Sequence, residues 1–187
     1  VVSAVADLSM AITDTPDPIT AGFDVTYTIT VSTSLPDAID ATLTSPVPPG
    51  TTFRALAAPG GWSCATPAVG ATGTVSCTAA TLPPGDTVFT LAVRVPAAAV
   101  AGSTVTDVAS IAVETGGRPA VASDSEGTTV AAATVLGATK TVSGDFVPGG
   151  SIVYTIVLTN AGPGNQADNP GNELTDVLPP ELEGFTL

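Results

Sequence analysis

The stretch Asp24-Val-Thr-Tyr-Thr-Ile-Thr-Val-Ser-Thr33 alternates apolar and hydroxylated side chains along its whole length. A period of two is typical of a β-strand with one buried face, because successive side chains point to opposite sides of a sheet. Two more runs, over residues 87–95 and 105–113, alternate in the same way. The sequence therefore predicts strands in all three stretches.

Clusters of proline and glycine separate these runs, and no window of helical length keeps a 3.6-residue period without Gly or Pro. The clusters are Pro16-Asp17-Pro18, Pro48-Pro49-Gly50, Pro59-Gly60-Gly61, Pro83-Pro84-Gly85 and Gly116-Gly117. Short strands with strong turns between them indicate an all-β protein built as an Ig-like antiparallel β-sandwich.

The chain also repeats itself. Ala21–Ser32 matches Pro148–Thr159, and Leu43–Pro49 matches Leu174–Pro180. A weaker match aligns Leu8–Thr13 with Leu136–Thr141. We therefore expect tandem Ig-like β-sandwiches, with a first module over residues 1–133 and an incomplete second one over residues 134–187. The second would hold the N-terminal part of the module, about three strands, joined closely enough to the first to give a stiff rod.

Charge and composition exclude several functions. The 187 residues include 17 acidic and 4 basic side chains, for a net charge of −13, and no histidine. The absence of histidine removes the Ser-His-Asp triad and the commonest metal ligand, and the acidity argues against nucleic-acid binding. No apolar stretch is long enough to span a membrane. Because the chain begins at Val1 without a basic leader, we expect a processed, secreted segment.

Several motifs resemble the bacterial "domain of unknown function 11" repeat. They are Ala6-Asp-Leu-Ser9, Thr15-Pro-Asp-Pro-Ile-Thr-Ala-Gly22, Thr26-Tyr-Thr-Ile-Thr-Val31, Val47-Pro-Pro-Gly-Thr-Thr-Phe53, Gly61-Trp-Ser-Cys64 and Gly73-Thr-Val-Ser-Cys77. The resemblance implies strings of Ig-like modules in large secreted or cell-surface proteins, and it implies no molecular activity.

The two cysteines, Cys64 and Cys77, lie on short strand-like segments joined by a Gly/Ala/Pro linker. A redox or metal pair is one interpretation, but the spacing is not Cys-x-x-Cys, and two ligands without histidine make no zinc site. We predict a structural disulfide formed in an oxidising compartment.

Lys140 is the single lysine, and the repeat places it where the first module has Ile12. Asp176 likewise replaces Ser45. Two unpaired charges inside a sandwich would be very costly, so we expect them to meet. One outcome is a buried salt bridge. The other is an intramolecular isopeptide bond, in which a neutral lysine amine attacks an Asn or Asp side chain beside a catalytic carboxyl, here Asp176. A solvent-facing lysine remains a third interpretation.

Three other features have a structural and a functional interpretation. Asp107 alternates with apolar residues and is either a vestigial acceptor or, as we prefer, a hydrogen-bonded aspartate at a strand end or bulge. Asp124, Glu126 and Asp145 near the join could bind calcium, but a solvated acidic surface is favoured, and we expect no cofactor and no metal. Trp62 is either an exposed binding aromatic or packed on the disulfide.

Together these features favour a structural or interaction module of a secreted, extracellular or cell-surface protein, acting as a stalk or as a subunit of an adhesin or filament. Alternatives are a carbohydrate- or matrix-binding module and a non-catalytic accessory domain of a larger secreted enzyme. We expect no enzyme activity. The expected partners are neighbouring repeat modules or other subunits, joined by strand addition, and O-glycans are a candidate modification.

Overall fold

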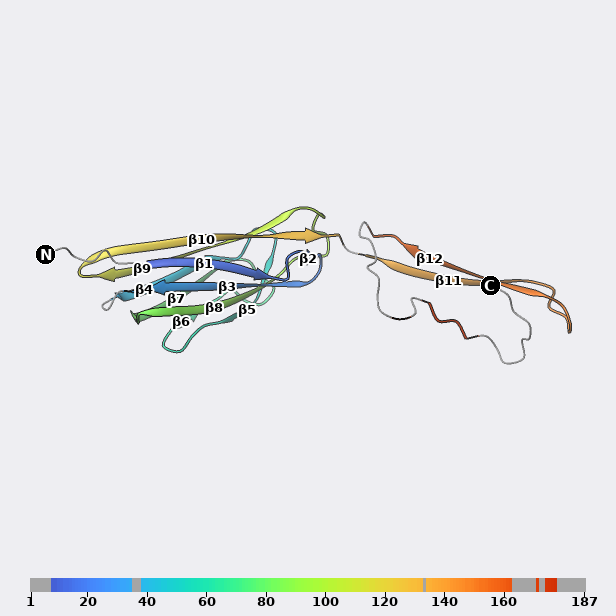
Figure 1. The fold of residues 1–187 in the computed structure, drawn as a ribbon, viewed down its shortest axis with the longest axis horizontal. Coiled ribbons are helices and arrows are strands. Elements are labelled where there is room, and N and C mark those ends of the chain that lie inside the picture. Colours follow the sequence, from blue (N-terminus) through green and yellow to red (C-terminus); the bar gives the residue numbers. More distant parts are fainter. Residues whose placement is uncertain (1–7, 35–37, 133, 163–170, 172–173, 178–187) are drawn as a thin grey trace.

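The computed structural model describes residues 8–34, 38–132, 134–162, 171 and 174–177. It is all-β, with an Ig-like sandwich of two sheets followed by a separate two-stranded sheet (Figure 1). The strands are β1 (Leu8–Thr15), β2 (Ile19–Thr20), β3 (Asp24–Thr33), β4 (Ala38–Pro46), β5 (Thr52–Ala57), β6 (Ser63–Ala65), β7 (Thr74–Leu82), β8 (Gly85–Arg94), β9 (Thr104–Thr115), β10 (Arg118–Ala131), β11 (Leu136–Gly144) and β12 (Ile152–Asn160).

The smaller sheet of the sandwich has the order β1-β3-β8-β5, and all its pairs are antiparallel. Its centre is the stretch quoted first, since β3 pairs with β1 on one side and β8 on the other. The larger sheet has the order β2-β10-β9-β4-β7-β6. Here β2 runs parallel to β10. Because β1 lies in the smaller sheet and β2 in the larger one, the chain crosses between the sheets through the turn Pro16-Asp17-Pro18. Prolines suit this crossing because they cannot donate to a continuing strand ladder.

The core lies between the inner faces of the two sheets. Val25, Tyr27, Ile29 and Val31 of β3 are all fully buried, as the alternation predicts. They face inward together with Phe89, Leu91 and Val93 of β8 and Ile111 of β9, which are equally buried. At the edge between the sheets, the backbone N–H of Ile12 in β1 donates to Asp124 Oδ2 in β10 at 2.8 Å. The first copy is therefore a closed sandwich with a continuous apolar centre.

The third sheet, β11–β12, repeats the β1–β3 pair in register. In the first copy Ile12 lies opposite Ile29, and in the second Lys140 lies opposite Ile156. The equivalence holds along both strands, because Leu8 faces Thr33 just as Leu136 faces Asn160. β11 begins at Leu136 shortly after β10 ends at Ala131, and the hairpin lies beyond the end of the sandwich (Figure 1).

The third strand expected for the second copy does not form over residues 174–177, which are described but belong to no strand. Residues 178–180 of the same repeat lie outside the described part of the chain. The physical reason is the absence of pairing: in the first copy the corresponding β4 pairs with β7 and β9. The described residues of the second copy provide no counterpart of either strand.

Candidate functional site

The predicted disulfide is confirmed. Cys64 of β6 and Cys77 of β7 are bonded, with a sequence separation of 13. They lie directly opposite each other in the β6–β7 ladder, between the neighbouring pairs Ser63–Thr78 and Ala65–Ser76. Cys77 is fully buried, so the bond connects the three-residue edge strand β6 to the core.

Lys140 and Asp176 lie together in the second copy. Lys140 Nζ is 2.6 Å from Asp176 Oδ1 and 2.8 Å from Oδ2, and it also lies 4.5 Å from the centroid of the Tyr154 ring. The two charged side chains are 37% and 28% exposed, so this ion pair is partly solvated, in contrast to the buried setting expected from the sequence. The difference arises because no second sheet covers this face within the described residues.

The corresponding positions of the first copy hold a different set of side chains. Ile12 and Ser45 take the places of Lys140 and Asp176, and both are buried, with exposures of 4% and 1%. Tyr27, the counterpart of Tyr154, is also buried. The same inward-facing position of this strand pair therefore holds an apolar side chain, Ile12, in the first copy and a cationic one, Lys140, in the second.

Asp107 is a fully buried carboxylate in β9 of the first copy. Ser45 Oγ donates to its Oδ1 at 3.3 Å, whereas Oδ2 has no hydrogen-bond partner. Burial raises the pKa of Asp107 from 3.8 to about 6, and the hydrogen bonds from Ser45 and the Val108 backbone oppose this shift. The expected hydrogen bond is present, but the bulge is not, because Asp107 pairs with Glu126 in an unbroken ladder.

A second polar group inside the sandwich was not anticipated from the sequence. The Tyr27 hydroxyl lies 2.8 Å from Thr128 Oγ1 and 3.4 Å from the Val105 carbonyl, and Thr128 donates in turn to Asp14. Burial raises the pKa of Tyr27 from 10.0 to about 12. The inward-facing tyrosine within a strand was the available signal, because a buried phenol requires a partner.

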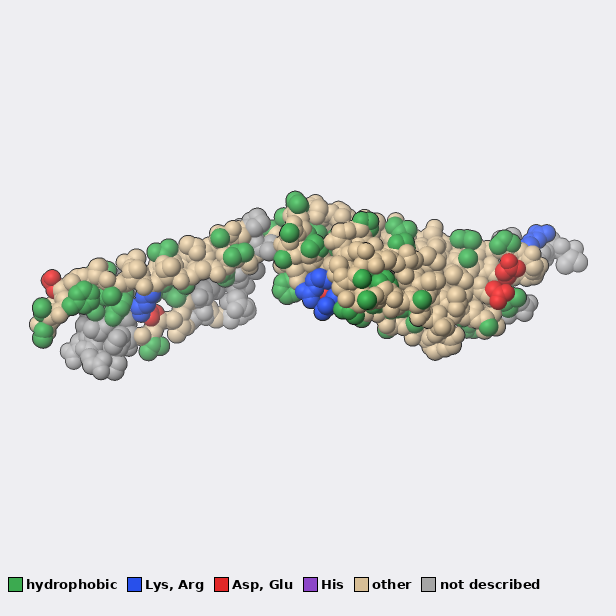
Figure 2. All heavy atoms as spheres, turned by 180° about the vertical axis from the view of Figure 1, so that it is seen from behind, with side chains coloured by type: hydrophobic (Ala, Val, Ile, Leu, Met, Phe, Trp, Pro, Cys, Tyr) green, Lys and Arg blue, Asp and Glu red, His purple; other side chains and the backbone are tan. Residues whose placement is uncertain are grey.

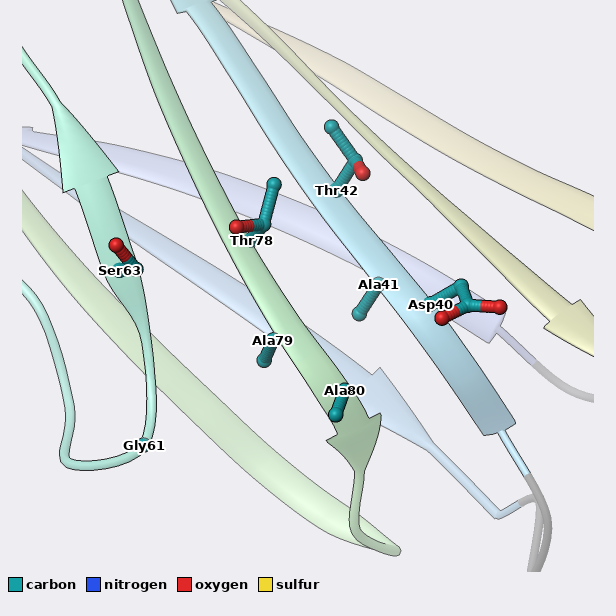
Figure 3. Close-up of a pocket in the computed structure, with 8 residues that line it drawn as sticks. All are labelled: Asp40, Ala41, Thr42, Gly61, Ser63, Thr78, Ala79 and Ala80. Atoms are coloured by element: carbon teal, nitrogen blue, oxygen red, sulfur yellow. The ribbon is translucent and has the colours of Figure 1, made fainter.

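An open hollow of about 450 Å³ lies across β4, β6 and β7 (Figure 3). Asp40 lies at its rim with a φ of 51°, where the register of β4 against β9 shifts. None of the described residues that line the hollow carries an aromatic ring; they are Asp40, Ala41, Thr42, Gly61, Ser63, Thr78, Ala79 and Ala80. Trp62 instead packs edge-on against Phe89, with ring centroids 4.9 Å apart. The described lining of this hollow therefore lacks the aromatic ring that a carbohydrate-binding module would use.

The acidic residues near the join do not gather into a metal site. Among the described residues no group of three or more Asp, Glu, Cys or His side chains could hold a metal ion. In the same part of the chain, no helix is long and apolar enough to cross a membrane.

Comparison with solved structures supports the fold. A C-terminal fragment of the major pilin GBS80 of Streptococcus agalactiae matches 70% of this chain over 57% of its own length, with a TM-score of 0.52 and 9% identity. BcpA, the major pilin subunit of Bacillus cereus, matches 70% of this chain over 41% of its own length, with a TM-score of 0.51 and 11% identity. This chain thus spans about half the length of the pilin chains it matches. No protein-family profile matches the chain, and no curated protein is similar to it in sequence.

Proposed function

We propose that this chain is a non-catalytic structural module of a secreted protein, repeated in tandem to build the stalk of an adhesin or part of an extracellular filament. One observation carries the proposal: the strand pair β1–β3 recurs as β11–β12 in the same register, shortly after the first sandwich ends. A module copied along the chain adds length, and such repeats contact mainly their neighbours.

Three further features support this function. The first copy has a closed apolar core, and the hollow across β4, β6 and β7 is open to solvent, whereas ligand sites usually enclose most of the ligand. Its disulfide is the kind that persists outside reducing compartments. The fold likeness to major pilin subunits agrees with a filament or stalk role. Neighbouring modules and other subunits are the proposed partners, and the resemblance to the "domain of unknown function 11" repeat supports an Ig-like module at the cell surface.

The test is immunogold electron microscopy with antibodies raised against this chain, applied to intact cells that express the full gene. We expect gold particles on the cell surface or along filaments that extend from it. Labelling that appears only after the cells are permeabilised would contradict the proposal. Cells lacking the gene provide the control.

We also propose a covalent role for Lys140 when the second copy is complete. Ser45 contacts Asp107 in the first copy, and Asp176 is the counterpart of Ser45. A residue at the counterpart of Asp107 would therefore lie beside both Asp176 and Lys140. In the completed copy the Lys140 ammonium first passes a proton to Asp176. The neutral amine then attacks the side-chain carbonyl carbon of an Asn or Asp there, while the protonated Asp176 carboxyl donates a hydrogen bond to that carbonyl oxygen. One C–N bond forms, the bond to the amide nitrogen or hydroxyl oxygen breaks, and ammonia or water leaves with the amine proton.

Intact-protein mass spectrometry tests this step in a chain whose second copy is completed. Residues 50–132 of the first copy are joined directly after Pro180, so that the graft supplies a copy of Asp107. We expect the folded product to lack the mass of one water, and to lack one ammonia when the grafted aspartate is replaced by asparagine. The Lys140→Met control should keep its full mass. If the folded grafted chain keeps its full mass, no covalent bond has formed, and Lys140 and Asp176 make only a salt bridge.

A further inference from the structure

The free edge of β12 is the counterpart of a strand edge that is covered in the first copy. There β3 lies between β1 and β8. Its counterpart β12 pairs with β11 on one side, and within the described residues no strand pairs with the other side. A strand edge of this kind presents backbone donors and acceptors that favour the addition of another strand.

The side chains of β12 keep the pattern of a covered strand. Ile152, Tyr154, Ile156 and Leu158 correspond to four residues of β3 that are fully buried. In the second copy Leu158 is 55% exposed. Figure 2 shows apolar side chains along the β11–β12 part of the molecule. Ile152, Tyr154 and Ile156 are only partly buried, so this apolar face of β12 is less covered than the same face of β3.

The first copy shows which strand fits. β8 lies antiparallel to β3, with Ile29 opposite Phe89 and Thr28 opposite Thr90. Phe89, Leu91 and Val93 face inward, and all three are fully buried. A partner of β12 would therefore carry apolar side chains at the same three alternate positions.

Contacts at the two ends of β8 indicate which charges the partner needs. Near one end, Ser32 Oγ donates to Asp86 Oδ1 at 2.6 Å, and Thr159 keeps a hydroxyl at the counterpart of Ser32. That hydroxyl now donates over 3.4 Å to the Gly137 carbonyl, a weak bond that is readily exchanged. At the other end Arg94 Nε is 2.6 Å from Asp24, whose counterpart is the neutral Ser151. An acidic residue near the start of the partner strand would therefore favour its binding to β12, and no arginine is needed at the end of that strand.

We propose that β12 accepts a β8-type strand of this repeat, antiparallel and in the register of the first copy. Thr155 then lies opposite the counterpart of Thr90, and Val157 opposite the counterpart of Val88. This inference rests on the proposed assembly function and names the surface and the strand through which it acts. Backbone hydrogen bonds supply affinity, and the three apolar side chains set the register.

The test uses the full chain and synthetic peptides with the sequence of residues 85–94. Thr155→Cys and Val157→Cys chains are each mixed with peptides carrying Thr90→Cys or Val88→Cys, activated as 2-pyridyl disulfides. The thiolate of the chain attacks the sulfur of the peptide cysteine, a new disulfide forms, and thiopyridone is released and measured by its absorbance. Directly opposite residues have Cβ atoms close enough for a disulfide, whereas diagonal neighbours are about 7–8 Å apart.

We expect the matched pairs, 155 with 90 and 157 with 88, to react at least tenfold faster than the crossed pairs. A peptide with Phe89, Leu91 and Val93 all replaced by threonine should lose this preference. Equal rates in all four combinations overturn the proposed register. Failure of every peptide to bind shows that β12 does not accept a β8-type strand, which also overturns the proposal. Neither result alters the cell-surface labelling that tests the proposed function.

Discussion

The ionised carboxylate of Asp107 lowers the stability of the folded chain by an amount that depends on its buried surroundings. Its side chain is fully buried, and among the described residues one of its oxygens has no partner while Ser45, at 3.3 Å, is its side-chain donor. A buried ionised group without a full set of partners destabilises the folded state. A neutral isostere or a proton should therefore stabilise the first copy.

The stability of the first copy should depend on the pH between about 4 and 6. The pKa of Asp107 is about 6 in the folded chain and 3.8 when unfolded, so in this range the folded state holds a proton that the unfolded state releases. Stability then rises as the pH falls through 6 and is lost as the pH rises. Between pH 7.5 and 4.5 the free energy of unfolding should gain about 2 kcal/mol from this residue.

Asp107→Asn isolates that contribution from the other carboxylates of this acidic chain. We expect the variant to be more stable than the parent at pH 7.5, with the difference shrinking toward pH 4.5. Urea titrations at both pH values measure it. A constant difference between variant and parent across this range would show that Asp107 does not titrate there.

At the scale of the strand, the β6–β7 hairpin depends on its disulfide. β6 is three residues long and forms the edge of the larger sheet, so its own ladder bonds are few. A cross-link over 13 residues restricts the unfolded chain by roughly 3 kcal/mol on the entropic account. Reduction should lower the free energy of unfolding by about that amount.

Urea unfolding with and without a thiol reductant checks this value, and a Cys64→Ala/Cys77→Ala variant serves as the control. Amide exchange should accelerate first in β6, while β3 and β8 stay protected because their contacts are independent of the bond. A uniform loss of protection across both sheets would show that the disulfide stabilises the whole sandwich instead.

The strands that could be predicted from the sequence are those with one buried face. β3 spans the predicted residues 24–33, β8 covers the run 87–95 as far as Arg94, and β9 encloses the run 105–113, because alternation reports burial directly. β2 and β6 are too short to show a period, and they exist through hydrogen bonds to β10 and β7. The bulge at Asp40 likewise depends on pairing with β9, which local sequence does not encode.

The candidate site was predictable to a similar extent. The contact of Lys140 with Asp176 followed from comparing the two copies, since the repeat placed both charges on one side of the strand pair. Their partial exposure could not be inferred, because it depends on which strands cover the face. The orphan oxygen of Asp107 also depends on distant packing, since Ser45 precedes it by 62 residues.

At the scale of the whole molecule, the short join between β10 and β11 determines whether the two copies act as one rod. Its two ends are each bonded to their own copy: Val130 exchanges hydrogen bonds with Gly102 and Ser103, and Val135 donates to Asn160 Oδ1 and accepts from Ala161. Because few residues separate these anchors, we expect the second copy to have little freedom to swing relative to the first.

Insertion of Gly-Ser-Gly-Ser after Ala132 should release that constraint, since such linkers behave as flexible coils. With spin labels at Val88→Cys and Val157→Cys, we expect the distance distribution from pulsed electron resonance to broaden about twofold. The unfolding midpoint of the first copy should not change, because no core contact is touched. The same insertion in the Gly116-Gly117 turn is the matched control and should leave the distribution narrow. If the parent chain is already as broad as the variant, the copies are not held as a rod, and the stalk would owe its stiffness to contacts with other subunits.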